Sequence, residues 1–323
     1  MEKFSVPILL MTFNRLDTTK IVFAEIKKIK PCKLFVSSDG PRVAKDGENE
    51  QVEAVRDFIL NNIDWDCEVK TLFRDNNLGC MVADRSAITW FFENVEEGII
   101  LEDDCLPHPT FFKFCEELLD RYREDERIMS IGGNNFQNGI KRGDYSYYFS
   151  AFTYVWGWAT WRRAWQKYDK DLKTLPKFEK NRKINNYFKS FVDRQYWMSN
   201  FKDAYDKKID TWDYAWLYCC FLNSGFTCVP NVNLVKNIGF GHNQATHTTI
   251  NIDNFVVDME LMNFPLRHPL SMQRNAEADE YYNRKIFRVI TRKAYYISIL
   301  EKLKIYSFLK KIFIFFRKKR KDV

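Results

Sequence analysis

The heptapeptide Gly98-Ile-Ile-Leu-Glu-Asp-Asp104 joins a short apolar run directly to three consecutive acids. Such a run, bounded by polar residues, is typical of a buried strand. Ligands of open α/β sheets bind beyond the carboxyl ends of the strands. Because Glu102, Asp103 and Asp104 follow the strand at once, the sequence predicts a ligand site at that edge of a sheet.

The segments before this heptapeptide alternate short apolar runs with longer helical patterns. Further strands are expected at 6–11, 33–37 and 68–73, and helices at 18–30, 51–61 and 83–93. This alternation predicts an α/β fold with a central, mostly parallel, twisted sheet flanked by helices. Later segments predict exposed helix over 177–208, a helix-like apolar run that follows 210–216 and ends at 222, and a strand at 229–235.

The net charge of +7 is concentrated at the C-terminus. Residues 302–323 contain nine Lys or Arg and one acid, a net charge of +8, which leaves about −1 for the rest of the chain. A basic groove across the body is therefore not expected, and no nucleic-acid partner is indicated.

The cysteines and the apolar segments indicate where the chain resides. Its eight cysteines form no CxxC pair and have no histidines at zinc-finger spacing, so we expect reduced, mostly buried thiols. The apolar run near the N-terminus is too short for a secretory signal. No apolar stretch reaches the roughly 20 residues of a spanning helix. These features predict a cytoplasmic protein.

The acidic triplet predicts a metal site. Adjacent carboxylates raise one another's pKa unless a cation neutralises them. Mn²⁺ or Mg²⁺ prefers hard oxygen ligands, and such ions often take one or two carboxylates together with substrate phosphates. We expect Asp104 to bind the metal, and a solvated acidic turn is the alternative. The sequence has no GxxxxGKS or GxxxxGKT loop and no GxGxxG after the first strand, so a nucleotide would bind without a glycine-rich phosphate loop.

Six short motifs follow one another in the order seen in N-acetylglucosaminyltransferase I, a glycosyltransferase of the GT-A type. They are PILLMTFNR (7–15), SDG (38–40), ILEDD (100–104), WGW (156–158), WD (212–213) and GFGHNQATH (239–247). Over roughly residues 5–250 the chain resembles a bacterial-type relative of that enzyme. The resemblance implies a GT-A fold and metal-dependent transfer from a nucleotide-diphosphate sugar, with a UDP-sugar such as UDP-N-acetylglucosamine favoured.

The resemblance also implies roles for single residues. Arg15 and Asp39 match positions that hold the uracil and ribose of the donor. Asp103 matches a ribose-contacting acid, Asp104 the direct metal ligand, and Glu102 is expected to support them. The residues expected to contact the donor are Thr12, Asn14, Arg15, Asp39, Glu102, Asp103, Trp156 and Trp158.

Asp213 matches the catalytic base of that family. An aspartate is ionised at neutral pH and can accept the proton of an attacking hydroxyl. Attack opposite the leaving group would invert the anomeric configuration. The family pattern has a second acid at the next position, where this chain has Tyr214. A helix N-cap is the alternative role for Asp213.

Histidine and tryptophan side chains complete the predicted site. His247 is expected to approach the metal or the diphosphate, with His242 as the competing candidate and a structural histidine as the alternative. Trp156 and Trp158 are expected to form a wall for a sugar ring. A helical core stripe through Trp158, Trp161 and Trp165 would show the same spacing.

We divide the chain into a catalytic domain, residues 1–270, and a helical extension, residues 271–323. The domain comprises a nucleotide-binding half, 1–130, and an acceptor and catalytic half, 131–270. From residue 295 apolar residues recur at near-helical spacing between lysines. Such a helix can lie in a membrane interface, which predicts a peripheral protein at the inner face of the membrane and a glycan or lipid-linked glycan acceptor. Packing of this helix on the body is the alternative.

Two other functions remain compatible with the sequence. A sugar nucleotidyltransferase would share the sheet type and the acidic metal site. That class usually has a glycine-rich, basic loop after the first strand, which residues 12–15 do not resemble. A carbohydrate-binding protein without activity is the second alternative.

Overall fold

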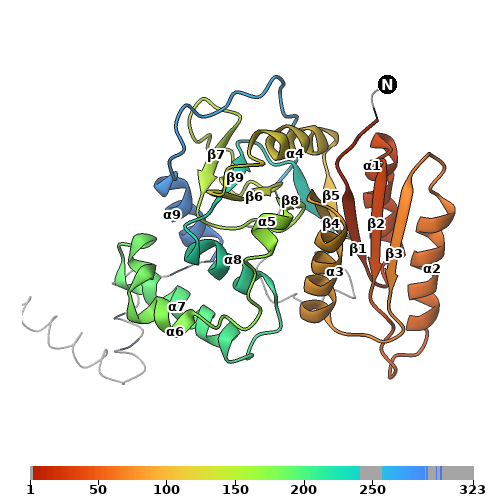
Figure 1. Ribbon diagram of the computed structural model, residues 1–323, viewed down its shortest axis with the longest axis horizontal. Coiled ribbons are helices and arrows are strands. Elements are labelled where there is room, and N and C mark those ends of the chain that lie inside the picture. The colour runs from red at the N-terminus through yellow and green to blue at the C-terminus, as the bar shows by residue number, and fades with distance from the viewer. Residues whose placement is uncertain (1–2, 241–256, 288, 290–295, 297–298, 300–323) are drawn as a thin grey trace, which may run out of the picture.

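The computed structural model describes residues 3–240, 257–287, 289, 296 and 299 (Figure 1). The strands of its main sheet are β1 (Ile8–Thr12), β2 (Lys33–Ser38), β3 (Glu68–Phe73), β4 (Glu97–Glu102), β6 (Ile128–Gly132), β7 (Tyr147–Ser150), β8 (Trp158–Trp161) and β9 (Phe226–Pro230). A small sheet pairs β5 (Cys105–Pro107) with β10 (Val235–Asn237). The helices are α1 (Leu16–Ile29), α2 (Glu48–Asn61), α3 (Cys80–Asn94), α4 (Pro109–Arg121), α5 (Arg162–Trp165), α6 (Leu175–Lys180), the 3-10 helix η1 (Lys183–Asn186), α7 (Phe191–Tyr205), α8 (Asp213–Leu222) and α9 (Ala276–Lys285).

The main sheet has the strand order β3-β2-β1-β4-β8-β6-β9-β7. Its strands run parallel except β8 and β7, which are antiparallel to their neighbours. Right-handed crossovers through helices are the usual way to join parallel strands, and α1, α2 and α3 connect the first four. The predicted α/β fold, with a mostly parallel sheet flanked by helices, is confirmed.

The central strands are buried on both faces. Ile8 and Leu10 of β1 pack in the cluster that contains α1, α2 and α4, whereas Leu9 and Met11 pack with α3 and α8. Successive side chains of a strand point to opposite faces, so a strand covered on both sides must be apolar throughout. This explains why the run before Glu102 shows no alternation of apolar and polar residues.

A second apolar cluster lies beyond the sheet, among α6, α7, α8 and α9 (Figure 1). Large aromatic rings fill it, including Trp197, Phe221 and Tyr282. The segment predicted as a helical extension contains α9, whose Ala278 and Tyr282 are buried in this cluster. The basic tail, residues 302–323, lies outside the described residues.

Two local predictions were wrong. The strand expected at 229–235 is divided, because β9 ends at Pro230 and β10 joins the small sheet. Between them Asn231 donates to the carbonyl of Tyr145 at 2.8 Å and so fixes a turn. The segment 177–208, expected to be exposed, contains α6, η1 and α7 and buries Trp197 in the second cluster.

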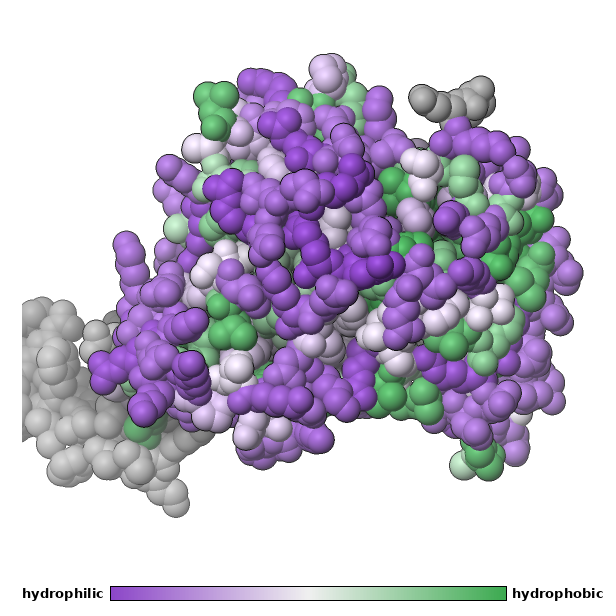
Figure 2. Space-filling model, viewed as in Figure 1, coloured by the Kyte–Doolittle hydropathy of each residue, from purple (hydrophilic) through white to green (hydrophobic). Residues whose placement is uncertain are grey.

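The polarity of the surface and the state of the cysteines agree with what the residue composition predicted. Hydrophilic residues cover most of the face drawn in Figure 2. Among the helices that the structure describes, none has the length and apolar character needed to cross a bilayer. All eight cysteines are unbridged and five are buried, as the sequence predicted.

Candidate functional site

Most of the predicted donor and metal residues lie at or just after the carboxyl ends of three adjacent strands. Thr12, the last residue of β1, pairs with Ser38 of β2, and Met11 pairs with Glu102 of β4. All three strands end at this edge of the sheet. The segments that follow therefore bring Arg15, residue 39 and residues 102–104 to one edge, as the sequence predicted.

Arg15 lies against two of the acids. Its Nη1 donates to Oδ2 of Asp104 at 2.8 Å, and its Nη2 donates to Oδ1 of Asp103 at 2.5 Å. The backbone N–H of Phe13 donates to the other oxygen of Asp103 at 3.2 Å. This arrangement was not expected, because the resemblance assigns Arg15 to the nucleoside of the donor. The arginine already supplies one positive charge to the acidic cluster.

The charges of the cluster shift one another's pKa. Burial opposes the charge on Arg15, but attraction by Asp103 and Asp104 outweighs it and raises the pKa of the guanidinium. Burial raises the pKa of Asp103 to about 6, although Arg15 lowers it. Burial, followed by the charges of Asp104, Asp84 and Asp103, raises the pKa of Glu102 well above its usual range. One arginine therefore does not neutralise the cluster.

Glu102, Asp104 and Cys105 could share a cation. One potential ligand atom from each lies within 4.8 Å of the others. The Cys105 thiol is buried, and burial together with the two acids raises its pKa, so it stays protonated and donates to Asp104 Oδ1 at 3.5 Å. Carboxylate oxygens suit Mn²⁺ and Mg²⁺, whereas a neutral thiol does not. The two acids fit a hard divalent ion that also binds phosphate and water oxygens.

The segment that follows β10 lies against Asp104. The backbone N–H of Ile238 donates to the Asp104 carbonyl at 2.8 Å, and Asn237 Nδ2 lies 3.4 Å from Asp104 Oδ1. A Cβ at Gly239 would lie 2.3 Å from Asp104 Oδ2 and 2.7 Å from Arg15 Nη1. A side chain there would displace the Asp104 carboxylate or the Arg15 guanidinium from its present position. Glycine therefore lets this segment pack on the cluster without moving either group.

Three of the residues predicted to contact the sugar donor form side-chain hydrogen bonds within the protein. Thr12 Oγ1 donates to the carbonyl of residue 37 at 3.2 Å, and Asn14 Nδ2 donates to Glu48 Oε1 at 3.0 Å. Asp39 accepts from the backbone N–H groups of Gly40, Leu78 and Gly79 at 3.0 to 3.2 Å. The carboxylate of Asp39 thus joins the end of β2 to the start of α3.

Asp213 is the first residue of α8, and the N-cap position belongs to Trp212. Its Oδ1 accepts from the Thr211 hydroxyl and from the backbone N–H of Tyr214, the latter at 2.9 Å. These two hydrogen bonds hold the carboxylate at the start of α8.

The two predicted sugar-binding tryptophans differ in exposure. Trp156 is half-buried, with ring centroids 5.4 Å from Phe136 and 5.3 Å from Phe240. Trp158 is fully buried, and its ring stacks on Trp212 at 5.7 Å. Because β8 is covered by α3 and α8 on that face, Trp158 has no surface to offer a sugar in this structure. Of these two residues, only Trp156 has a ring that is partly exposed.

The second predicted metal ligand, His247, and its competitor, His242, lie outside the described residues.

Sequence reasoning missed Asp84. This half-buried residue of α3 accepts a hydrogen bond from Cys80 Sγ at 3.0 Å. Burial, together with the charges of Asp103 and Asp39, raises its pKa to about 7, although the bond from Cys80 acts in the opposite direction. The available signal was its position, one turn into a helix that begins at the ligand edge of the sheet.

Comparisons with known proteins give only distant similarities. No protein-family model matches the chain, and no curated protein sequence matches it. A cytidylyltransferase from Leptospira borgpetersenii serovar Hardjo-bovis is 14% identical, with a TM-score of 0.31 over 51% of this chain and 63% of that one. S. aureus TarS is 10% identical, with a TM-score of 0.37 over 71% of this chain and 59% of that one. A UDP-glucose pyrophosphorylase complexed with UDP-glucose is 10% identical, with a TM-score of 0.30 over 50% of this chain and 78% of that one.

This chain thus spans about three fifths of the length of the first two proteins. Identities and TM-scores this low carry no argument about activity.

Proposed function

We propose that the chain is a metal-dependent glycosyltransferase of the GT-A type. It would move a sugar from a nucleotide-diphosphate donor, with UDP-N-acetylglucosamine the first to test, to a hydroxyl of a glycan or lipid-linked glycan. The observation that carries the proposal is the grouping of Glu102, Asp103 and Asp104 with Arg15 at the carboxyl edge of the sheet. Such an edge is where α/β sheets bind ligands.

The acids at this edge are assigned different roles in binding the sugar donor. When bound, Mn²⁺ or Mg²⁺ would be held by Asp104, with Glu102 beside it, and would neutralise charge on the leaving diphosphate. Arg15 fixes the orientation of Asp104 and adds a positive charge on the same side. Asp103 follows β4 and Asp39 follows β2, and both of these strands pair with β1. The two acids are assigned to the nucleoside.

Asp213 is assigned the proton transfer. A carboxylate oxygen would accept the proton of the acceptor hydroxyl as the hydroxyl oxygen attacks the anomeric carbon. Attack from the face opposite the nucleoside diphosphate, whose bond to that carbon breaks as it leaves, would invert the configuration. The hydrogen bonds from Thr211 and Tyr214 hold the carboxylate in one orientation at the start of α8. The half-buried ring of Trp156 offers an apolar face against which a sugar can stack.

The proposal is tested by release of nucleoside diphosphate from a panel of nucleotide sugars with Mn²⁺, with Mg²⁺ and with EDTA. We expect a UDP-sugar to release UDP with the metal and EDTA to abolish the reaction. Release of pyrophosphate from a nucleoside triphosphate and a sugar 1-phosphate would identify a nucleotidyltransferase instead. Glycan binding without turnover of any donor would identify a binding protein.

We also propose that the basic tail, residues 302–323, binds anionic membranes. Its net charge of +8 is attracted to acidic headgroups, and apolar residues between the lysines can enter the interface. A chain that ends at Ala294 should no longer cosediment with anionic liposomes, and it should keep its donor binding. Equal cosedimentation of both chains would contradict membrane binding by the tail.

A further inference from the structure

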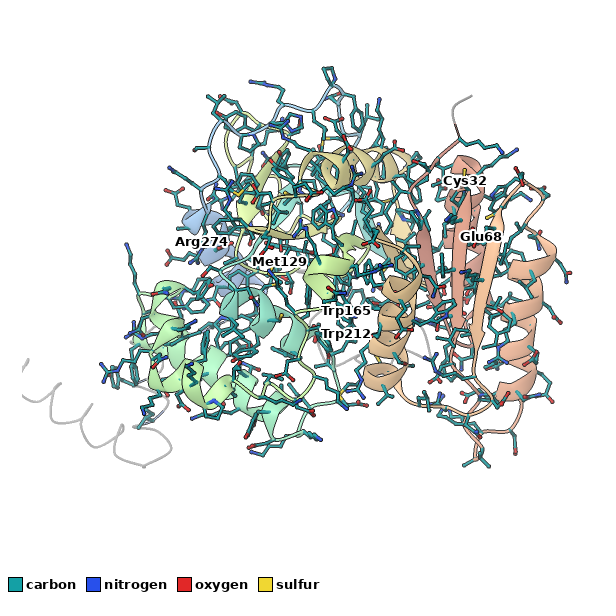
Figure 3. All side chains as sticks on the ribbon, viewed as in Figure 1. Cys32, Glu68, Met129, Trp165, Trp212 and Arg274 are labelled. Atoms are coloured by element: carbon teal, nitrogen blue, oxygen red, sulfur yellow. The ribbon has the colours of Figure 1, made fainter. Side chains whose placement is uncertain are left out.

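Arg56 is a buried cation of α2 that the proposed function does not use. Only 8% of the residue is exposed, and its guanidinium carbon lies 4.9 Å from the centroid of the Phe73 ring. Phe73 is the last residue of β3, and Figure 3 labels Glu68, the first, so the cation lies at the carboxyl end of that strand. It pairs with Glu53 at 2.8 Å, although half of the side chain of that acid is exposed. A cation buried to this extent needs further hydrogen bonds to offset the loss of its water.

Those hydrogen bonds run to the ends of two neighbouring strands. Nε of Arg56 donates to the hydroxyl of Ser38, the last residue of β2, at 3.1 Å. Nη2 donates to the carbonyl of Arg74, directly after β3, at 2.7 Å and to the carbonyl of Asp39, directly after β2, at 3.3 Å. A guanidinium is planar and presents its N–H groups at fixed angles. One rigid group therefore holds the chain where it leaves β2 and β3.

Asp39 is held from other directions as well. Its backbone N–H donates to the carbonyl of Thr12, at the end of β1, at 3.3 Å. Its carboxylate accepts from the backbone N–H groups of Leu78 at 3.0 Å and Gly79 at 3.2 Å, just before α3. Arg56 contributes the contact to the carbonyl of Asp39. The orientation of this aspartate therefore depends in part on a side chain of α2.

We infer that Arg56 is a positioning residue for the nucleoside of the donor, which acts by fixing Asp39 at the ligand edge of the sheet. The inference rests on the proposed function, in which Asp39 contacts the nucleoside. Loss of a hydrogen bond from a charged group typically costs about 10- to 100-fold in an equilibrium constant. Arg56→Met should therefore weaken binding of UDP with Mn²⁺ by about tenfold. Binding of inorganic pyrophosphate with Mn²⁺ should change by less than about threefold, because Asp104 follows another strand and keeps its contacts.

This difference between the two ligands separates positioning of the nucleoside from support of the fold. An arginine that only stabilised the fold would, when replaced, lower the melting temperature and leave both affinities of the folded chain unchanged. Calorimetry measures the two affinities. In assays of sugar transfer, Arg56→Met should raise KM for the donor by about tenfold and keep kcat within about threefold, as expected when binding alone is lost. Equal losses for UDP and pyrophosphate, or no loss for UDP, would overturn the inference.

Two further variants define which property of Arg56 matters. Glu53→Ala, the matched control, removes the exposed partner of the ion pair, leaves the bonds to the strand ends, and should bind UDP normally. Arg56→Lys, which keeps the charge without the planar fork, serves if Arg56→Met does not fold, and should weaken UDP binding by at least about threefold. Normal UDP affinity in Arg56→Lys would assign the effect to charge alone. A loss in Glu53→Ala as large as that in Arg56→Met would assign it to the ion pair, and either result would overturn the inference.

Hydrogen exchange tests the same contact without any ligand. The amides of Leu78 and Gly79 are protected while they donate to the Asp39 carboxylate, and they should exchange about tenfold faster in Arg56→Met than in Glu53→Ala. Unchanged exchange would overturn the inference whatever the chain binds. Absence of UDP binding by the unaltered chain, together with faster exchange in Arg56→Met, would count against the proposed function and not against the hold of Arg56 on Asp39.

Discussion

Asp104→Ala is expected to lower metal-dependent release of nucleoside diphosphate by about 10²- to 10³-fold, the usual cost of losing one group that stabilises charge in the transition state. The change removes one of the two carboxylates that fit a hard cation. Arg15 keeps its bond to Asp103, so the fold should persist. Far-ultraviolet circular dichroism and the melting temperature verify folding before the rate is compared.

The matched control for this variant is Asp57→Ala, an exposed aspartate of α2. It should turn over donor at the rate of the unaltered chain. Titration of Mn²⁺, followed by electron paramagnetic resonance, should show weaker binding in Asp104→Ala and no change in Asp57→Ala. Turnover by Asp104→Ala at the normal rate, with a normal requirement for Mn²⁺, would refute the assignment of this acid.

Asp213→Asn is expected to lower kcat by about 10²- to 10⁴-fold, the range that a general base contributes. Asparagine keeps an oxygen that can accept from Thr211 and from the backbone of Tyr214, so the first turn of α8 should stay in place. The affinity for UDP with Mn²⁺ should be unchanged, because Asp213 is assigned to the acceptor. Stopped assays of sugar transfer, with calorimetry for UDP, separate the two effects.

Asp210→Asn provides the control, since this exposed residue lies three positions before Asp213. It should leave both kcat and UDP affinity unchanged. A variant at 213 that transfers sugar at the normal rate would remove Asp213 from the mechanism. A variant that loses UDP binding together with turnover would reassign this residue to the donor site.

The sheet and its ligand edge could be predicted because their signals are local. Strands covered on both faces are apolar throughout, and the change from Leu101 to Glu102 marks the end of β4 directly. The predicted ends of β1 and β2 likewise placed Arg15 and Asp39 at the same edge. Neighbouring parallel strands have their carboxyl ends at the same edge of a sheet. The positions of these residues could therefore be predicted without knowing how the helices pack on the sheet.

The contacts inside the site depend on pairs that are distant in the sequence. Arg15 meets Asp103 and Asp104 across about 90 residues, and Asp39 accepts from the backbone N–H groups of Leu78 and Gly79 across about 40. The spacing of residues within one segment does not indicate which distant residues they will contact. The steric requirement at Gly239 is of the same kind, since it arises only when that segment packs on Asp104.

Trp158 shows how a short strand can mislead. The spacing of Trp158, Trp161 and Trp165 is compatible with a helix, and the motif at 156–158 suggested a sugar-binding wall. The structure instead places the first two residues on β8, an antiparallel strand inserted between β4 and β6. A strand of four buried residues is too short to show a period of its own, so its burial appears only in the assembled sheet.

The most direct test is a crystal structure of the full chain with Mn²⁺ and UDP, examined by anomalous diffraction at the manganese absorption edge. We expect one manganese peak in coordination contact with the carboxylate of Asp104 and with oxygens of both phosphates, with the nucleoside beside Asp39. A diphosphate bound elsewhere, or bound with no manganese at Asp104, would contradict the metal site on which the transferase proposal depends.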